Sequence, residues 1–128
     1  MGNNRQVLID TSAWVASFRK NEETRKKIKR LIEEDRAAIC GVVVYELLQG
    51  IRDNDEASVI EKALQGLHFY ETSQEVWHSA GLSSCLLRRN GVTIPMSDVV
   101  IAAVARMYDL EVLTTDAHFK QIDNLKFY

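Results

Sequence analysis

Short apolar runs alternate along the chain with longer stretches in which apolar and polar residues are mixed. The runs are bounded by polar or turn-forming residues and predict strands at Val7–Ile9, Ala37–Cys40, Leu67–Tyr70, Glu111–Leu113 and Leu125–Tyr128. Helices are predicted between them, at Ser12–Lys20, Glu22–Glu34, Val42–Arg52, Glu56–Gln65, Ser73–Arg89 and Ser97–Tyr108, with a short turn near Asp116. Because strands alternate with helices, the pattern indicates an α/β domain whose parallel sheet has helices on both faces.

Local signals refine two of these helices. Thr72 with Glu75 has the spacing of a capping box at the start of one helix, and Asn90–Gly91 predicts where that helix ends. The later run 99–105, Val-Val-Ile-Ala-Ala-Val-Ala, is apolar on every side of a helix. We therefore expect the helix that contains it to be deeply packed.

Composition limits the class of protein. The chain has 128 residues, of which 46% are hydrophobic and 27% charged, and this balance is typical of one folded domain. No linker, repeat or low-complexity segment divides it, so we expect a single domain over residues 1–128. The formal net charge of −2 argues against a strongly basic nucleic-acid-binding surface, so any such binding needs a local patch.

One segment, Arg19–Arg36, has more basic than acidic residues. Three of its cations are candidates for contact with RNA phosphates: Lys26, Lys27 and Arg30. The alternative is a solvated amphipathic helix with three apolar residues facing inward: Ile28, Leu31 and Ile32. Both interpretations can hold on different faces of the same helix.

The cysteines and the apolar runs bear on the cellular compartment. Cys40 and Cys85 lie in apolar stretches and form no CxxC motif, which favours buried reduced thiols over a zinc site. The first residues are polar, so we expect no signal peptide, and the run 99–105 is too short to span a bilayer. We expect a cytoplasmic protein that has no contact with membranes.

Four acids occur where apolar residues dominate: Asp10, Glu46, Asp98 and Asp116. Asp10 and Asp116 each follow a predicted strand, which places both at the carboxyl edge of the sheet, where open α/β folds bind ligands. Asp98 lies at the start of the apolar helix, and Glu46 lies in a helix that leaves a strand. All four are therefore expected to approach one another at this edge.

Carboxylates brought together in this way repel one another, and a divalent cation removes the conflict. Hard cations such as Mg²⁺ and Mn²⁺ prefer oxygen ligands, so the sequence predicts a site for one of them. Each acid also has a simpler explanation. Asp10 and Asp116 are suited to helix caps, Asp98 to the positive end of a helix dipole, and Glu46 to an exposed helix face.

The segments around the four acids resemble the PIN-domain family, specifically its small VapC-type ribonuclease toxins. The resemblance covers the whole chain and rests on four motifs that occur in the family's order. They are Val-Leu-Ile-Asp-Thr-Ser at 7–12, Val-Tyr-Glu-Leu-Leu-Gln-Gly at 44–50, Ile-Pro-Met-Ser-Asp-Val-Val-Ile-Ala-Ala at 94–103, and Leu-Thr-Thr-Asp-Ala-His-Phe at 113–119. One departure is Cys40–Gly41, where the family often has Ser or Thr, so we expect a weaker helix cap there.

The resemblance implies a three-layer fold with a central parallel sheet of four or five strands, and metal-dependent RNA hydrolysis. The implied catalytic acids are Asp10, Glu46, Asp98 and Asp116. Mg²⁺ or Mn²⁺ would be held by Asp10, Asp98 and Asp116, and Ser12 or Thr114 would orient a carboxylate or a water. The expected partners are an RNA substrate, a cognate antitoxin and a second copy of the chain in a homodimer.

Three other classes of protein are alternatives to a PIN-domain nuclease. A non-catalytic PIN-like module should lack at least one of the four acids, which this chain retains. A receiver-like regulator needs an acidic neighbour beside Asp10 and an Asp after the strand that ends at Tyr70, where Glu71 stands instead. A haloacid dehalogenase-type phosphatase needs an Asp at the position of Ser12. His118 is interpreted as a surface or capping histidine, with substrate contact as the alternative.

Overall fold

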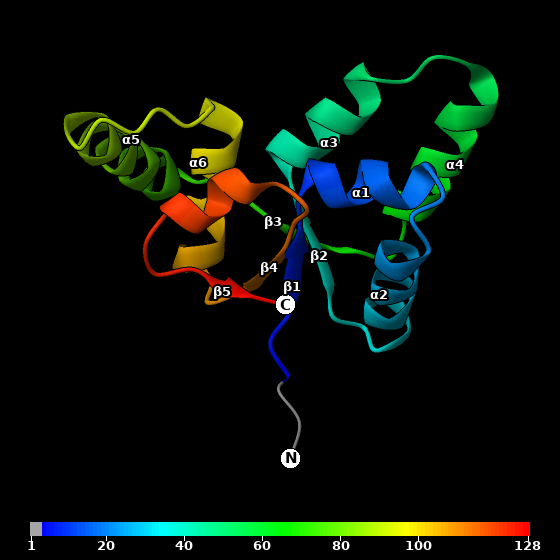
Figure 1. Cartoon of the computed structure of the whole chain (residues 1–128). Helices are drawn as coiled ribbons and strands as arrows, with labels where there is room; N and C mark the ends of the chain where they lie inside the picture. The colour runs from blue at the N-terminus through cyan, green and yellow to red at the C-terminus, as the bar shows by residue number, and fades with distance from the viewer. Residues whose placement is uncertain (1–3) are drawn as a thin grey trace.

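The computed structural model describes residues 4–128, in which helices and strands alternate as the sequence predicts (Figure 1). The strands are β1 (Val7–Ile9), β2 (Ala37–Cys40), β3 (His68–Tyr70), β4 (Glu111–Leu113) and β5 (Lys126–Phe127). The helices are α1 (Thr11–Phe18), α2 (Glu22–Glu33), α3 (Gly41–Gln49), α4 (Asn54–Leu64), α5 (Gln74–Arg89), α6 (Met96–Met107) and the short 3₁₀ helix η1 (Ala117–Gln121). The polar start of the chain, on which the signal-peptide expectation rests in part, includes residues 1–3, which lie outside the described residues.

The five strands form one parallel sheet in the order β3-β2-β1-β4-β5. From β1 the chain first proceeds to β2 and β3 on one side and later returns to β4 and β5 on the other. The order of strands therefore reverses between β1 and β4. This position is the switch point of the sheet, at which open α/β folds bind their ligands.

Helices cover both faces of the sheet, which gives the three layers expected from the sequence. In Figure 1, α2 and α4 lie on one side of the strands and α5 and α6 on the other, while α3 lies above the strand ends. Burial follows this arrangement. All residues of β1, β2 and β4 are buried, and so is the whole run 99–105 of α6, as its apolar sequence predicts.

The two edge strands differ from the three central ones. β3 has only partly buried or exposed residues, and β5 is exposed, because each is paired on one side only. α5 ends at Arg89 with Asn90 as its C-cap, and Gly91 follows with a φ of +78°, a conformation that favours glycine and that confirms the predicted helix end.

Three local expectations were wrong. The N-cap of α5 is Ser73, whose hydroxyl accepts a hydrogen bond from the Val76 N–H, and Thr72 lies one residue too early to cap the helix. Ile32 is 45% exposed because it faces a groove between helices and not the core. Cys85 is only partly buried, whereas Cys40 is fully buried; both are free thiols.

No helix within residues 4–128 is long and apolar enough to cross a bilayer.

Candidate metal centre

The fold brings the ends of β1 and β4 together at the switch point, and with them two of the four acids. Asp10 directly follows β1, and its backbone N–H donates to the carbonyl of Leu113 at the end of β4. Asp116 lies three residues beyond β4 and is the N-cap of η1. Asp98 belongs to the first turn of α6, and Glu46 to the second turn of α3.

Asp10 is 2% exposed and is fixed by hydrogen bonds to both carboxylate oxygens. Its Oδ1 accepts from Ser12 Oγ at 2.7 Å and from the Ala13 N–H at 3.1 Å. Its Oδ2 accepts from Thr114 Oγ1 at 2.9 Å. Burial raises the pKa of the Asp10 carboxyl, and these three donors lower it, so the bonds help to keep a buried carboxylate ionised.

The two hydroxyls that hold Asp10 are themselves fixed. Ser12 Oγ accepts the Thr115 N–H at 3.0 Å, and Thr114 Oγ1 accepts the Asp116 N–H at 2.9 Å. Each hydroxyl has a single proton, which it donates to Asp10. Among residues 4–128, Thr114 is the one donor to Asp10 Oδ2, so this oxygen retains acceptor capacity with which to bind a cation.

The other two aspartates form a cluster with a histidine. His118 Nδ1 lies 3.1 Å from Asp116 Oδ1 and 3.6 Å from Asp98 Oδ2. One ligand atom of each of these three residues lies within 4.8 Å of the others, a spacing that suits a shared metal ion. Asp116 Oδ1 also accepts the His118 N–H at 2.9 Å, so the capping function expected for Asp116 coexists with membership of the cluster.

Asp98 shows most directly that the acids act on one another. Burial, together with the negative charges of Asp116, Asp10 and Glu46, raises its pKa from 3.8 to about 6, although His118 acts in the opposite direction. All four acids predicted from the sequence therefore lie close enough to influence a single carboxyl group. Such a shift is typical of a functional cluster of like charges.

Glu46 lies at the margin of this cluster. It is partly buried, and its Oε1 accepts a hydrogen bond of 2.6 Å from Thr11 Oγ1. Cys40 is the N-cap of α3 and makes no side-chain capping bond, as its replacement of Ser or Thr predicts. The hydrogen bond from Thr11 thus ties Glu46 of α3 to the start of α1.

The residues fit a divalent metal ion. Carboxylate oxygens dominate the cluster, and these are the ligands that Mg²⁺ and Mn²⁺ prefer. Within residues 4–128, no lysine or arginine forms an ion pair with any of the four acids, and His118 is the basic side chain that lies beside two of them. The negative charge thus lacks a strong protein counter-charge, which a cation would supply.

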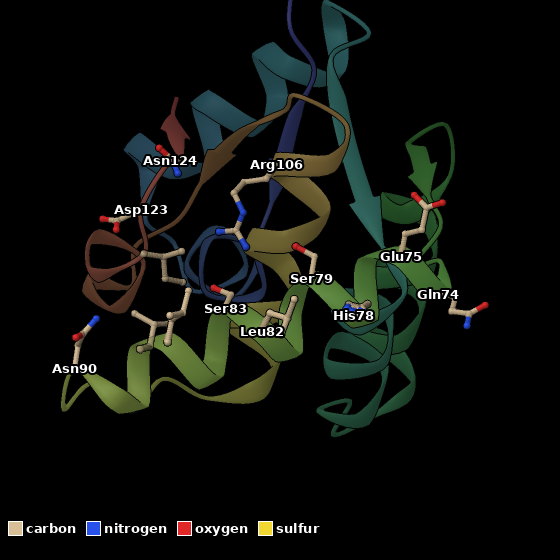
Figure 2. A pocket seen from close by; sticks show the side chains of 13 residues that line it. Gln74, Glu75, His78, Ser79, Leu82, Ser83, Asn90, Arg106, Asp123 and Asn124 are labelled. Carbon is tan, nitrogen blue, oxygen red and sulfur yellow. The ribbon is translucent and has the colours of Figure 1, made fainter.

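A cavity of about 740 Å³ elsewhere has a different character (Figure 2). It lies between α5 and the segment after η1, and Arg106 points into it alongside Ser79 and Ser83. None of the four acids lines this cavity. Burial lowers the pKa of Arg106, but the clustered carboxylates that suit a divalent cation are at the switch point, so we place the candidate site there.

Sequence reasoning underestimated His118. Its position two residues after Asp116 favoured a surface or capping residue, with substrate contact as the alternative, and the approach of Asp98, twenty positions earlier in the chain, is a feature of the tertiary structure. One signal in the sequence could have indicated this contact. His118 lies at the start of the short helix that follows Asp116, and the start of this helix lies at the same edge of the sheet as the start of α6.

Comparison with known proteins agrees with the fold. A model of the PIN domain matches residues 7–125, almost the whole chain, and all four acids lie within the match. The chain belongs to the PIN-domain family.

Within that family the similarity is to proteins named VapC. Ribonuclease VapC11 of Mycobacterium tuberculosis is 31% identical over 121 residues, which are 91% of this chain and 90% of that protein. A VapC ribonuclease of Mycobacterium bovis matches to the same extent. The resemblance to VapC-type proteins that the motifs predict is thereby confirmed.

Solved structures share the fold. DNA-bound VapBC from Salmonella typhimurium superposes with a TM-score of 0.83 at 20% identity, covering 97% of both chains. VapBC-5 from M. tuberculosis, a member of the VapBC family of toxin–antitoxin systems, gives a TM-score of 0.68 at 20% identity, covering 95% of this chain and 94% of that one. These likenesses confirm the predicted three-layer architecture.

Proposed function

We propose that this protein is a metal-dependent endoribonuclease and the toxin of a VapBC-type toxin–antitoxin pair. The observation that carries the proposal is the convergence of Asp10, Glu46, Asp98 and Asp116 at the switch point, expressed in the raised pKa of Asp98. The relatives named VapC ribonuclease support the reaction class, and the VapBC complexes support the toxin–antitoxin setting.

The four acids would have two roles, metal binding and the positioning of a water, according to their surroundings. Asp98 and Asp116, together with Oδ2 of Asp10, would hold the cation, which we expect to be Mg²⁺ or Mn²⁺. A divalent ion in such a site lowers the pKa of a bound water and polarises a phosphate oxygen. Glu46, held at one oxygen by Thr11, has a second oxygen with which to accept a hydrogen bond from an attacking water.

Ser12 and Thr114 would act as positioning residues. Their hydroxyls hold both oxygens of Asp10 and are themselves held by backbone N–H groups at the start of the segment that carries Asp116. The network therefore links the ends of β1 and β4.

The regulatory alternative, a PIN-like module without catalysis, predicts the same fold but no dependence of RNA cleavage on these acids.

Purified protein incubated with a mixture of structured RNAs tests the proposal. We expect cleavage in the presence of Mg²⁺ or Mn²⁺, none in EDTA, and a loss of at least about 100-fold in Asp98→Asn. Asp123→Asn is the matched control, because Asp123 is exposed and lies outside the acidic cluster. Equal cleavage by both variants would refute the assignment.

An apolar groove is the surface that we assign to the antitoxin. It has a volume of about 820 Å³ and is lined by residues of α1, α2, α3 and α4, including Phe18, Ile32, Leu47 and Val59. Ile32 and Val59 are 45% and 55% exposed, so a partner segment with an apolar face would cover them. Glu46 also lines this groove, so the bound segment would extend to the edge of the acidic cluster.

Val59→Asp should therefore weaken antitoxin binding by about tenfold or more, because it buries a charge in the complex, while leaving RNA cleavage intact. Leu82→Asp, on the exposed face of α5, is the control. Unchanged antitoxin affinity in Val59→Asp would place the partner on another surface.

A homodimer would use a different surface, which we assign to Trp77. This residue of α5 is 47% exposed, whereas Trp14 lies in the core at 1%, and aromatic residues favour interface centres. Trp77→Glu should shift the mass measured by light scattering toward that of a monomer. Leu82→Glu, five positions further along α5, should not. The opposite result would move the interface to the Leu82 side of the helix.

A further inference from the structure

We infer that His118 is a direct ligand of the metal and that it makes the site prefer Mn²⁺ over Mg²⁺. The inference rests on the proposed metal-dependent function and adds a residue and a choice of ion to it. It comes from the position of the imidazole nitrogen relative to two carboxylates.

The three ligand atoms already have the spacing of one coordination sphere. Six ligands at 2.0–2.1 Å from an ion place neighbouring ligand atoms about 3 Å apart and opposite ones about 4.2 Å apart. His118 Nδ1 is 3.1 Å from Asp116 Oδ1 and 3.6 Å from Asp98 Oδ2, and one ligand atom of each residue lies within 4.8 Å of the others. An ion can therefore enter with side-chain adjustments alone.

The turn that carries His118 is held in place on both sides. Asp116 caps it by accepting the His118 N–H at 2.9 Å. The next residue, Phe119, is fully buried in the core, and its N–H donates to the Asp116 carbonyl. With its backbone fixed between a cap and a core aromatic ring, His118 presents its imidazole to the acids.

The donor set decides between ions. Mg²⁺ retains water and oxygen ligands and gains little from an imidazole nitrogen, whereas first-row transition ions bind nitrogen more strongly. A site with one imidazole among several carboxylates is still rich enough in oxygen for Mn²⁺. His118 thus adds a bond that benefits Mn²⁺ and leaves Mg²⁺ with the carboxylates alone.

A simple counter-charge would behave in the opposite way. If His118 only neutralised the acids as an imidazolium, it would compete with a bound cation. Removing it would then strengthen the binding of both Mg²⁺ and Mn²⁺. If His118 is a ligand, its removal weakens the binding of Mn²⁺ and abolishes the preference for Mn²⁺. The two roles therefore predict opposite changes in Mn²⁺ affinity.

Metal titration without RNA separates them. Affinities for Mn²⁺ and Mg²⁺ are measured by calorimetry for the unaltered protein, for His118→Gln, and for the control His78→Gln, an exposed histidine of α5 outside the cluster. We expect the unaltered protein and His78→Gln to bind Mn²⁺ at least about tenfold more tightly than Mg²⁺. His118→Gln should lose that ratio through weaker Mn²⁺ binding, with Mg²⁺ affinity unchanged.

Pulsed electron paramagnetic resonance gives a second readout that does not require the variant to fold. Mn²⁺ bound to the unaltered protein should show hyperfine coupling to an imidazole ¹⁴N nucleus. Absence of that coupling, or a Mn²⁺ to Mg²⁺ ratio that His118→Gln leaves unchanged, would overturn the assignment of His118 while the metal site stands. Failure of the unaltered protein to bind either ion would overturn both the inference and the proposed function.

Discussion

At the scale of single residues, the candidate metal centre contains hydroxyl groups that donate to one of its carboxylates. Asp10 is buried, and burial alone would favour its protonated form. Ser12 and Thr114 oppose this by donating to its two oxygens. Burial and neighbouring negative charge raise the pKa of Asp98 to about 6, and no hydroxyl among residues 4–128 donates to it. The hydroxyl donors therefore distinguish the surroundings of Asp10 from those of Asp98.

Replacing Thr114 should test this role. Thr114→Val keeps the shape but removes the donor to Asp10 Oδ2 and the acceptor of the Asp116 N–H. The pKa of Asp10 should rise, and the affinity for Mg²⁺ should fall by about 10-fold to 100-fold, because a positioned ligand loses its support. Calorimetry measures this, with Thr115→Val on the exposed neighbour as control. Equal affinities in both variants would contradict the role of Thr114.

The metal-free protein should lose stability as pH rises from about 4 to about 6. Over this range the folded state holds the proton of Asp98, whose pKa is raised from 3.8 to about 6, after the unfolded chain has released it. The free energy of unfolding must then decrease with increasing pH, and Asp10, whose pKa is also raised, contributes with the same sign.

Urea unfolding in EDTA at a series of pH values measures this slope. Asp98→Asn should make it shallower, and Asp123→Asn should leave it as in the unaltered protein. Stability that rises with pH in this window would show that the acids are not mutually repelling.

At the scale of elements, local sequence patterns were sufficient where a segment is buried on all sides. β1, β2, β4 and α6 follow directly from their apolar runs. The edge strands β3 and β5 are shorter than predicted, because one-sided pairing and exposure let the ends of the apolar run leave the sheet. Ile32 looked like a core residue because helical spacing cannot distinguish the core from an apolar groove.

The start of α5 provides a stability test at this scale. Thr72 and Ser73 are both suitable capping residues, and only backbone geometry selects Ser73. Ser73→Ala should lower the free energy of unfolding by about 1 kcal/mol. Thr72→Val should be neutral or stabilising, because the buried Thr72 hydroxyl has no hydrogen-bond partner among residues 4–128. Urea unfolding compares the two variants. A larger loss of unfolding free energy in Thr72→Val than in Ser73→Ala would show that Thr72 is the capping residue.

The structure of the basic helix α2 is compatible with both of its interpretations, contact with RNA phosphates and a solvated amphipathic helix. Lys27 pairs with Glu23 at 3.5 Å and Arg30 with Glu34 at 3.1 Å, while Lys26 has no ion pair among the described residues. Exposed pairs of this kind are weak, so RNA phosphates can replace the glutamates.

Changing Lys26, Lys27 and Arg30 together to Ala should weaken binding to single-stranded RNA and flatten the dependence of log K on log salt by about 2. Filter binding over a range of salt concentrations measures this, with the inactive Asp98→Asn background preventing cleavage. An unchanged slope would place the RNA on a different face.

At the scale of the whole molecule, the order of strands creates the site. The acids come from positions 10, 46, 98 and 116, and they meet because β1 and β4 are neighbours at the switch point while α3 and α6 begin at the same edge. The sequence predicted that strand ends would bring acids together. It did not predict which strands adjoin or that His118 joins the cluster, since both depend on contacts between distant segments. Near this edge, the groove that contains Glu46 offers a partner access to the acids.

Sequencing of RNA ends in cells after induced expression of the protein tests most directly whether the four acids support RNA cleavage. We predict new 5′ ends at a restricted set of positions, appearing with the unaltered protein and with Asp123→Asn but not with Asp98→Asn at equal protein levels. The same new ends in cells that express Asp98→Asn, or none with the unaltered protein, would contradict the account.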